Sequence, residues 1–336
     1  MAQPALDFFT TRGLAVKAEV TEGVDPTGTS ALNSFDIMNG KSGTEFDKVE
    51  RKRDRVFFTG DPFVVANKRA FIEGEIELIP PTVPGAAGAT GTAPCEVVLL
   101  PCGMSRAVSL VTDTTTLTPI SRNIPTVFCY WWHSGTYLEV AAARGNINGL
   151  KMEIGARFMA NVRLQGTYVE KEEVAIPTDF DYSDFTAPLV AEYNNSKMIS
   201  NVGDSAGATV GTADLHLWGK MLSVDFGNQL NTRQYTEKKV TAISDRKATF
   251  TARFARPAKA DFDVYAARDA GHTLLLAFTT TDAVTGLYSQ LSIRGQIEQI
   301  QDADIEGDFG YEISGPCVAS DAGNDEFSIV FGDATP

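Results

Sequence analysis

The sequence predicts an all-β protein with a few short helices, built as two tandem β-sandwich domains. Three observations lead to this prediction. Several segments alternate apolar and polar residues with a period of two, which is typical of strands that bury one face. Convincing amphipathic helices are scarce. The order of features in the first half of the chain also recurs in the second half, which indicates that one β-fold is used twice.

The clearest strand is "AFIEGEIELI", residues 70–79, where Ile72, Ile76 and Leu78 share one face. Side chains two positions apart on a strand point to the same side, so the opposite face collects the remaining residues. That face carries a row of three carboxylates: Glu73, Glu75 and Glu77.

Three further segments alternate in the same way and contain the Val, Thr, Ile, Phe and Tyr residues that favour strands: 156–170, 246–257 and 302–313. The last of them, "DADIEGDFGYEI", is expected to place a second row of carboxylates on one face: Asp302, Asp304, Glu306 and Asp308. Short helices are predicted in three places: 64–70, 138–144 and 262–270.

Breaks in these patterns suggest the domain boundaries. The Pro-, Gly- and Ala-rich stretch 80–94 is predicted to be a flexible connector, because it has too few apolar residues to pack. An acidic stretch bounded by prolines follows the first half, and its centre, 179–186, is predicted to be a linker. The two domains are therefore expected at 1–178 and 187–336.

The charge of the chain disfavours the capture of nucleic acid. Its 336 residues carry a formal net charge of −14. The first 178 residues hold 17 Lys and Arg against 20 Asp and Glu, and the rest hold 12 against 23. Binding to phosphate depends on Lys and Arg displacing counterions, so repulsion of DNA is easier to explain here than its capture.

One basic run stands against this background. The stretch "KVERKRDRVFF", residues 48–58, places five basic side chains within eight positions: Lys48, Arg51, Lys52, Arg53 and Arg55. In so acidic a chain, we expect these bases to meet carboxylates on a neighbouring copy of the protein. Their separate contributions are small when exposed, about 0–1 kcal/mol each, so many must act together.

Enzymatic motifs are weak. The stretch "GDSAG", residues 203–207, matches G-x-S-x-G, and His272 follows it, so a serine hydrolase that uses Ser205 is one alternative. The residues after Ser205 are rich in Gly and Thr and make a poor helix, and the chain has no His-Gly dipeptide. The three histidines share no metal-ligand spacing, and no phosphate loop or dinucleotide fingerprint occurs. We therefore expect no catalytic residues, no metal and no cofactor.

Four cysteines are few for this length: Cys95, Cys102, Cys129 and Cys317. They are expected to be free thiols, with a bridge between Cys95 and Cys102 as the alternative. The N-terminus lacks a secretory signal, and no apolar run approaches the roughly 18–20 residues of a membrane helix. The chain is expected in the cytosol and not in a membrane. The aromatic run "FCYWWHSG", residues 128–135, is expected to pack in a core or at a subunit interface.

Four stretches resemble the major tail tube protein of tailed bacteriophages of the siphovirus type. They are the opening "TEGVDPTGTSALNSFDIMNGKSGTEFDKVERKRDR" with the following "FVVANKRAFIEGEIEL", then "GARFMANVRLQGTYVEKEEVAIP", "SVDFGNQLNTRQYTEKKVTAISDRKATFTARF" and "GNDEFSIVFG". The resemblance covers nearly the whole chain. It implies a β-sandwich with a flanking helix, present twice.

The resemblance also implies a function and a set of partners. Members of this family close their inner hairpins into a β-barrel, and the resulting rings stack into a tube around the tape measure protein. A duplicated chain implies trimeric rings with pseudo-sixfold symmetry, with hexameric rings as the alternative. The tube meets the tail terminator and distal tail proteins, and double-stranded DNA passes through it without specific binding. The chain is thus expected in the virion, after assembly in the host cytoplasm.

Two surfaces would carry this function. An acidic wall repels DNA within a Debye length of about 8 Å at physiological salt, so one of the two carboxylate rows is expected to line the lumen. The row at 302–308 is favoured, because the second half of the chain is the more acidic. The basic run at 48–55 is expected to contact the adjacent ring, in a heterologous contact that propagates instead of closing. Another virion β-protein, such as a tail terminator or a capsid decoration protein, is the alternative.

Overall fold

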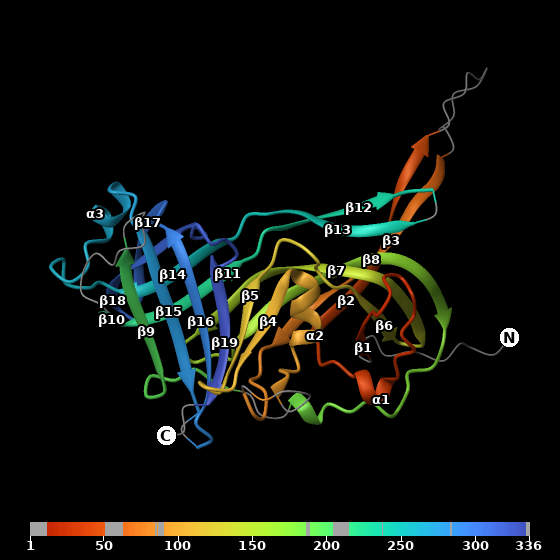
Figure 1. The fold of residues 1–336 in the computed structure, drawn as a ribbon, viewed down its shortest axis with the longest axis horizontal. Coiled ribbons are helices and arrows are strands. Elements are labelled where there is room, and N and C mark those ends of the chain that lie inside the picture. Colours follow the sequence, from red (N-terminus) through yellow and green to blue (C-terminus); the bar gives the residue numbers. More distant parts are fainter. Residues whose placement is uncertain are drawn as a thin grey trace.

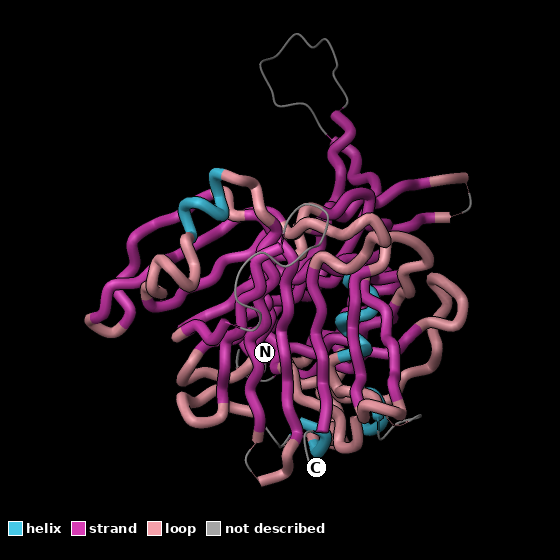
Figure 2. The backbone as a smooth tube through the Cα atoms, turned by 60° about the vertical axis from the view of Figure 1, so that its left-hand side comes forward, coloured by secondary structure: helices cyan, strands magenta, loops and turns pink. Residues whose placement is uncertain are grey.

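A computed structural model describes residues 12–50, 63–84, 86, 91–185, 189–203, 215–236, 238–282 and 284–333. Nearly all of its regular structure is strand, and its helices are short (Figures 1 and 2). The prediction of an all-β fold with a few short helices is confirmed. Among these residues, no helix has both the length and the apolar character needed to cross a membrane.

The elements divide between the two halves of the chain. The strands of the first half are β1 (Arg12–Ala18), β2 (Met38–Glu50), β3 (Phe63–Glu77), β4 (Met104–Ser109), β5 (Thr114–Pro119), β6 (Val127–His133), β7 (Thr136–Glu153) and β8 (Met159–Glu173). Those of the second half are β9 (Ser196–Gly203), β10 (Leu215–Leu217), β11 (Gly219–Asp225), β12 (Asn228–Gln234), β13 (Lys239–Arg246), β14 (Thr249–Ala255), β15 (Thr273–Thr281), β16 (Leu287–Gln296), β17 (Gln299–Ile305), β18 (Asp308–Pro316) and β19 (Phe327–Asp333). The helices are α1 (Ser30–Asn33), α2 (Glu96–Leu99) and α3 (Val264–Asp269), with 3-10 turns η2 (Leu100–Cys102) and η3 (Ser183–Phe185).

Two large sheets form the body of the molecule. The larger has the path β17-β18-β14-β11-β7-β8-β3-β2, and β1 and β6 join it at β7. The second has the order β10-β9-β15-β16-β19-β5-β4. Every pairing between these strands is antiparallel. One buried cluster contains residues of both sheets, so the sheets pack face to face.

The path of the larger sheet contains the same four-strand arrangement twice. In the first half the order is β2-β3-β8-β7, and in the second it is β11-β14-β18-β17. In each set a long hairpin comes first in the chain, then a helix, and then the hairpin that completes the set. The sets meet where β7 pairs with β11. The repeated topology thus accompanies the recurring order of features in the sequence.

The two halves share strand pairing as well as a core. The β7–β11 ladder runs from Leu150 opposite Val224 to Glu153 opposite Met221. The buried cluster extends from Leu14 in the first half to Phe331 in the second. The division at 1–178, 179–186 and 187–336 stays a prediction about separate folding units, and one of the experiments below tests it.

The alternation seen in the sequence explains which face each strand buries. On β3, Ile72 and Ile76 are each 1% exposed, and on β14 Phe250 and Phe254 are buried to the same degree. Burying side chains of this size contributes about 1.5–3 kcal/mol each, which is enough to specify the register of a strand. The aromatic run of β6 is also buried, as predicted, with Trp131 1% exposed.

Two of the three predicted helices are wrong. Residues 64–70 lie in β3 and residues 138–144 lie in β7, because cross-strand pairing outweighs the weak helical pattern of these short segments. Residues 64–70 pair with β2, and residues 138–144 pair with β6 and β8. The third prediction, 262–270, is confirmed by α3. The backbone N–H of Ala266, in the first turn of α3, donates to the Asp263 carboxylate at 3.1 Å, so Asp263 caps the helix.

The predicted connector 80–94 packs at both of its described ends. Pro80 and Pro81 are buried where they leave β3, and Ala93 is fully buried before α2. The Gly91 carbonyl oxygen accepts hydrogen bonds from Arg106 and Thr115. The prediction that this stretch is too poor in apolar residues to pack is therefore wrong for these ends.

Candidate functional site

The larger sheet has one face in the core and one polar face, and the polar face is the first candidate for function. Ladder pairs place side chains of adjacent strands on the same side, so the face can be followed across the sheet. Starting from Lys41 on β2, the ladder runs through Glu73, Arg163 and Asn146. Across the β7–β11 junction the same face continues from Glu153 on β7 and Met221 on β11 to Arg253, Glu312 and Gln301.

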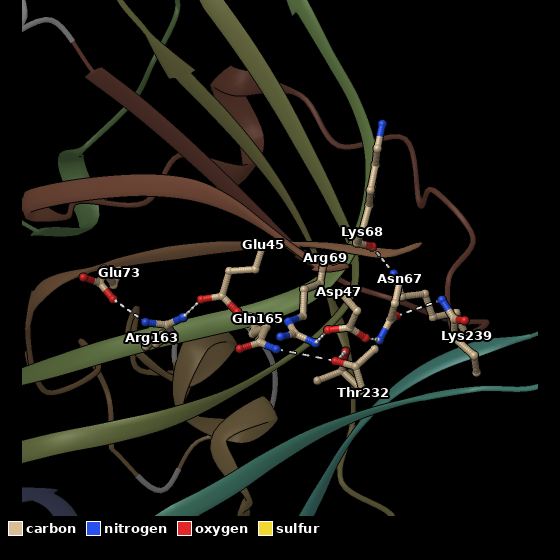
Figure 3. Close-up of polar contacts among 12 residues, drawn as sticks. Glu45, Asp47, Asn67, Lys68, Arg69, Glu73, Arg163, Gln165, Thr232 and Lys239 are labelled. Carbon is tan, nitrogen blue, oxygen red and sulfur yellow. Dashed lines mark hydrogen bonds and ion pairs between the residues drawn. The ribbon is translucent and has the colours of Figure 1, made fainter. Parts of the chain in front are cut away.

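Charges on this polar face are paired with one another (Figure 3). Arg163 lies between two carboxylates, 2.6 Å from Glu45 and 3.2 Å from Glu73. Further pairs join the cations Lys41, Arg69, Lys151 and Arg253 to Glu73, Glu45, Glu153 and Glu312 at 2.5–3.0 Å. Each of these five cations therefore has a carboxylate partner within the same chain.

The pairing keeps Glu45 ionised. Partial burial on its own raises the pKa of this carboxyl, but hydrogen bonds from Arg69 and Arg163 outweigh it and hold the pKa below its ordinary value. The guanidinium of Arg163 also lies 4.1 Å from the centroid of the Phe71 ring, which fixes its direction along the sheet. The polar face is thus an ordered network of alternating charge.

The first carboxylate row, Glu73, Glu75 and Glu77, lies on this polar face. Glu73 pairs with Lys41 and Arg163, and Glu75 accepts a hydrogen bond from the Asn39 amide at 3.2 Å. Glu77 is only 9% exposed and pairs with Arg157 at 3.0 Å. Burial raises the pKa of Glu77 in spite of this arginine. Two of the three carboxylates, Glu73 and Glu77, are therefore paired with cations of the same chain, and Glu75 is held by a neutral amide.

The second row differs from its prediction in two respects. It does not continue on one strand, because Glu306 and Gly307 form a two-residue turn between Ile305 of β17 and Asp308 of β18. Both turn residues have positive φ, 56° and 98°, as this hairpin geometry requires. The carboxylates thus divide between strand, turn and strand.

The face of the second row is also different. Asp302 is opposite Tyr311 and Asp304 is opposite Phe309, on the side of the sheet that carries the buried Ile313. Both aspartates are exposed because β17 extends beyond the core. Glu306 pairs with Lys220 at 2.5 Å. Asp302 and Asp304 therefore lie at an edge, on the side opposite to the polar face, whereas Asp308 shares the side of Glu312.

Of the predicted basic run, the structure describes Lys48. It lies near the end of β2, with Nζ 5.0 Å from the centroid of the Phe63 ring on the paired strand. Arg51, Lys52, Arg53 and Arg55 lie outside the described residues. Phe46 stacks on Phe63 with ring centroids 6.3 Å apart, and both are more than a third exposed. This end of the β2–β3 hairpin thus presents aromatic and basic side chains to solvent.

A second hairpin, the β12–β13 arm, was missed at the level of sequence. It leaves the larger sheet after Asp225 and lies across β7 and β8, as Figure 1 shows. Asn228 anchors its base by donating to the Gly145 carbonyl at 3.1 Å and to the Cys102 carbonyl at 2.6 Å. Further along, the Gln165 amide donates to Thr232 at 3.4 Å. The alternation of "LNTRQYTEKKVTAI" on either side of a polar turn is the signal that could have identified it.

Glu22 fixes the arm electrostatically. Its carboxylate lies 2.8 Å from Arg144 of β7 and 2.6 Å from Lys238 at the tip of the arm. Arg144 also donates to the carbonyl of Thr241, a fully buried residue of β13. Burial alone raises the pKa of Glu22, but the two hydrogen-bonded cations outweigh it, so its pKa is lowered.

Replacement of Glu22 by Gln is expected to cost about 1–2 kcal/mol of unfolding free energy at pH 7. A lowered folded-state pKa stabilises the fold above the unfolded value, 4.5, and this contribution is lost as pH falls through the folded pKa. The difference between wild type and E22Q, measured by denaturant unfolding, should therefore shrink as pH falls below 4.5 and disappear once pH is below the folded pKa of Glu22. The exposed Glu192 provides the control E192Q. A difference that stays the same from pH 7 down to the acid limit of folding would contradict the assignment.

The two ends of the larger sheet form the second candidate site. No described strand pairs with the outer edge of β2 or of β17. Such edges present unpaired N–H and C=O groups and readily accept another strand. The β17 edge is bordered by Asp302 and Asp304, and no described cation lies within 4.0 Å of either carboxylate. Both edges are therefore candidates for contact with another chain.

The serine-hydrolase alternative gains no support from the described residues. Ser205 lies outside them. They contain no group of three or more His, Cys, Asp or Glu arranged to hold a metal ion. All four cysteines are free thiols, as predicted, and burial raises the pKa of Cys317 to about 12. No family model matches the chain, and no curated protein matches its sequence.

Proposed function

We propose that this chain is a structural protein that joins copies of itself edge to edge into closed rings, and that the rings stack into a tube. The observation that carries the proposal is the β7–β11 junction. Within one chain, the last strand of the first four-strand set already pairs with the first strand of the second set. The unpaired edges, β17 and β2, are the last strand of one set and the first strand of the other.

The same junction can therefore be repeated between chains. Pairing β17 of one copy with β2 of the next would extend the sheet without any new type of contact, and closure of the sheet would remove both edges. With two sets per chain, three copies would give a ring of six sets. A heterologous contact of this kind closes into a ring when its rotation permits.

The polar face supports a bore through which DNA can move. Duplex DNA carries one negative charge for about every 1.7 Å of its axis, and free Lys or Arg would hold it. On this face Lys41, Arg69, Lys151, Arg163 and Arg253 are each held by a carboxylate of the same chain. We therefore assign the bore to the polar face, with Glu73 and Glu75 on it. Asp302 and Asp304 are assigned to the junction between chains.

This assembly would place the protein in the virion as the tail tube of a phage of the siphovirus type, around a tape measure protein and between a terminator and distal tail proteins. Negative-stain microscopy of the purified protein at increasing concentration tests the proposal. Long hollow filaments of constant width, with threefold or pseudo-sixfold cross-sections, are expected. A monomer at every concentration would overturn it, and single rings that never stack would favour a terminator.

A further inference from the structure

Each half of the chain extends one long hairpin, and only one of the two lies along the body. The β12–β13 arm lies on β7 and β8, and its far end contacts the base of the β2–β3 arm, where the Gln234 amide donates to the Asn67 side chain at 2.8 Å and Lys239 donates to the Lys68 carbonyl (Figure 3). Beyond this base the β2–β3 arm extends away from the body (Figure 1). We propose that the β2–β3 arm of one copy docks on the β17–β18 hairpin of the next, as the β12–β13 arm docks on β7 and β8 within the chain. This inference rests on the proposed edge-to-edge assembly and names the contact that sets its register.

The ladders fix which residues of the two arms correspond. In the first set, regular pairing stops after Glu45 opposite Arg69, and in the second it stops after Asp225 opposite Thr249. Arg69 is also the first residue of β3 that pairs with β8, and Thr249 is the first residue of β14 that pairs with β18. Pairing resumes with Asp47 opposite Ala66 in the first arm and with Asn228 opposite Arg246 in the second. Asp47 therefore occupies the position of Asn228.

The receiving residues follow in the same way. Asn228 donates its backbone N–H to the Asn146 side chain at 2.8 Å. Asn146 of β7 is opposite Arg163 of β8. Arg163 lies four residues before Thr167, and Thr167 is the residue of β8 that pairs with Arg69. The corresponding residue of β18 is Glu312, four residues before Pro316, which is the partner of Thr249.

Glu312 is opposite Gln301 of β17, so Gln301 occupies the position of Asn146. Its exposed amide oxygen offers the same acceptor that Asn146 offers to Asn228. We infer that the backbone N–H of Asp47 in one copy meets Gln301 in the next.

The docking cannot occur within one chain, because β2 and β17 lie at opposite ends of the eight-strand path. The arm bears the marks of an uncovered contact surface. Apolar side chains on it are 39–53% exposed: Phe46, Val49, Phe63, Val64 and Val65. The docked arm carries Thr232 and Thr241 against its receiving strands instead, and Thr241 is fully buried.

The charges of the two surfaces are complementary. Lys48 is adjacent to Asp47 on the arm, and Asp302 is adjacent to Gln301 on the receiving strand. Residues 299–313 contain five carboxylates and no Lys or Arg. When Asp47 lies at Gln301, antiparallel pairing places Lys48 opposite Ile300. Asp302 is then a diagonal neighbour of Lys48 on the same face, about 7–8 Å away and within reach of a lysine side chain. A second copy of this chain therefore matches the arm in backbone geometry, apolar area and charge.

Disulfide trapping tests the register. The double variant Asp47→Cys/Gln301→Cys is expected to form covalent oligomers up to the size of the closed ring when oxidised. Cys95, Cys102 and Cys129 are buried and do not interfere. The control variant Asp47→Cys/Asp321→Cys should give no series of covalent oligomers, because Asp321 lies in an exposed loop beyond β18. Each single variant should give none either.

Charge exchange tests the same contact without oxidation. Lys48→Glu and Asp302→Lys are each expected to raise the concentration needed for assembly about fivefold, and the double variant should restore it. Filaments that form normally without trapping or charge rescue would overturn the arm contact and leave the proposed tube intact. A wild-type protein that never assembles would overturn both.

Discussion

Replacement of Asp302 by proline is expected to abolish polymerisation and to leave the monomer folded. Ile305 and Asp308 close a two-residue turn, so their backbone groups bond to each other. Hydrogen-bonded and outward-facing positions alternate along an antiparallel strand, so the N–H groups of Asp304 and Asp302 point away from β18. Proline at position 302 removes one outward N–H and no bond of the internal ladder, and edge strands tolerate it.

The readout is filament formation by microscopy, with sedimentation to confirm that the variant stays a folded monomer. Asp302→Asn is the matched control, because it changes the side chain but keeps the N–H, and it should still assemble. Normal filaments from D302P would show that the β17 edge is not the junction. Assembly lost in both variants would instead assign the effect to the carboxylate.

Arg246→Ala is expected to lower the free energy of unfolding by about 3–5 kcal/mol, because Arg246 belongs to a buried ion pair. Its guanidinium lies 2.6 Å from Glu326, a residue only 8% exposed. It also donates to the carbonyl oxygens of Ile120 at 3.0 Å and Gly103 at 3.4 Å. Alanine would leave a buried carboxylate and two carbonyl groups without this partner.

This arginine connects the second half of the chain to the first, so the experiment also tests the domain division. Denaturant unfolding followed by two probes should show one cooperative transition in wild type, and R246A should shift all of it. Arg253→Ala removes a more exposed pair, with Glu312, and should cost no more than about 1 kcal/mol. Two separate transitions, with only the second shifted, would support independent domains at 1–178 and 187–336.

Several features of this fold could be predicted from particular residues. The alternation of Ile72, Ile76 and Leu78 gave the buried face of β3, because the two-residue period is a property of the strand itself. The segment 262–270 was predicted as a short helix and is α3. The carboxylates of 70–79 were placed together on one face for the same local reason.

Other features depend on contacts that no local pattern contains. The row at 302–308 has the alternation of one strand, but Glu306 and Gly307 adopt positive φ and turn the chain. A free acidic wall was expected at Glu73, yet its partner Arg163 is 90 residues away in the sequence. Residues 138–144 have a helical composition, and pairing with β6 and β8 makes them a strand.

The sequence by itself determined that the chain is β-rich, which faces its strands bury, and that its features recur, because these follow from side chains spaced a few residues apart. Only the tertiary structure decided that the two sets share one sheet, that charges on its polar face neutralise each other, and that one arm is docked while its equivalent is not. These depend on pairings between residues tens to hundreds of positions apart, where the register of backbone hydrogen bonds and burial select one arrangement among many.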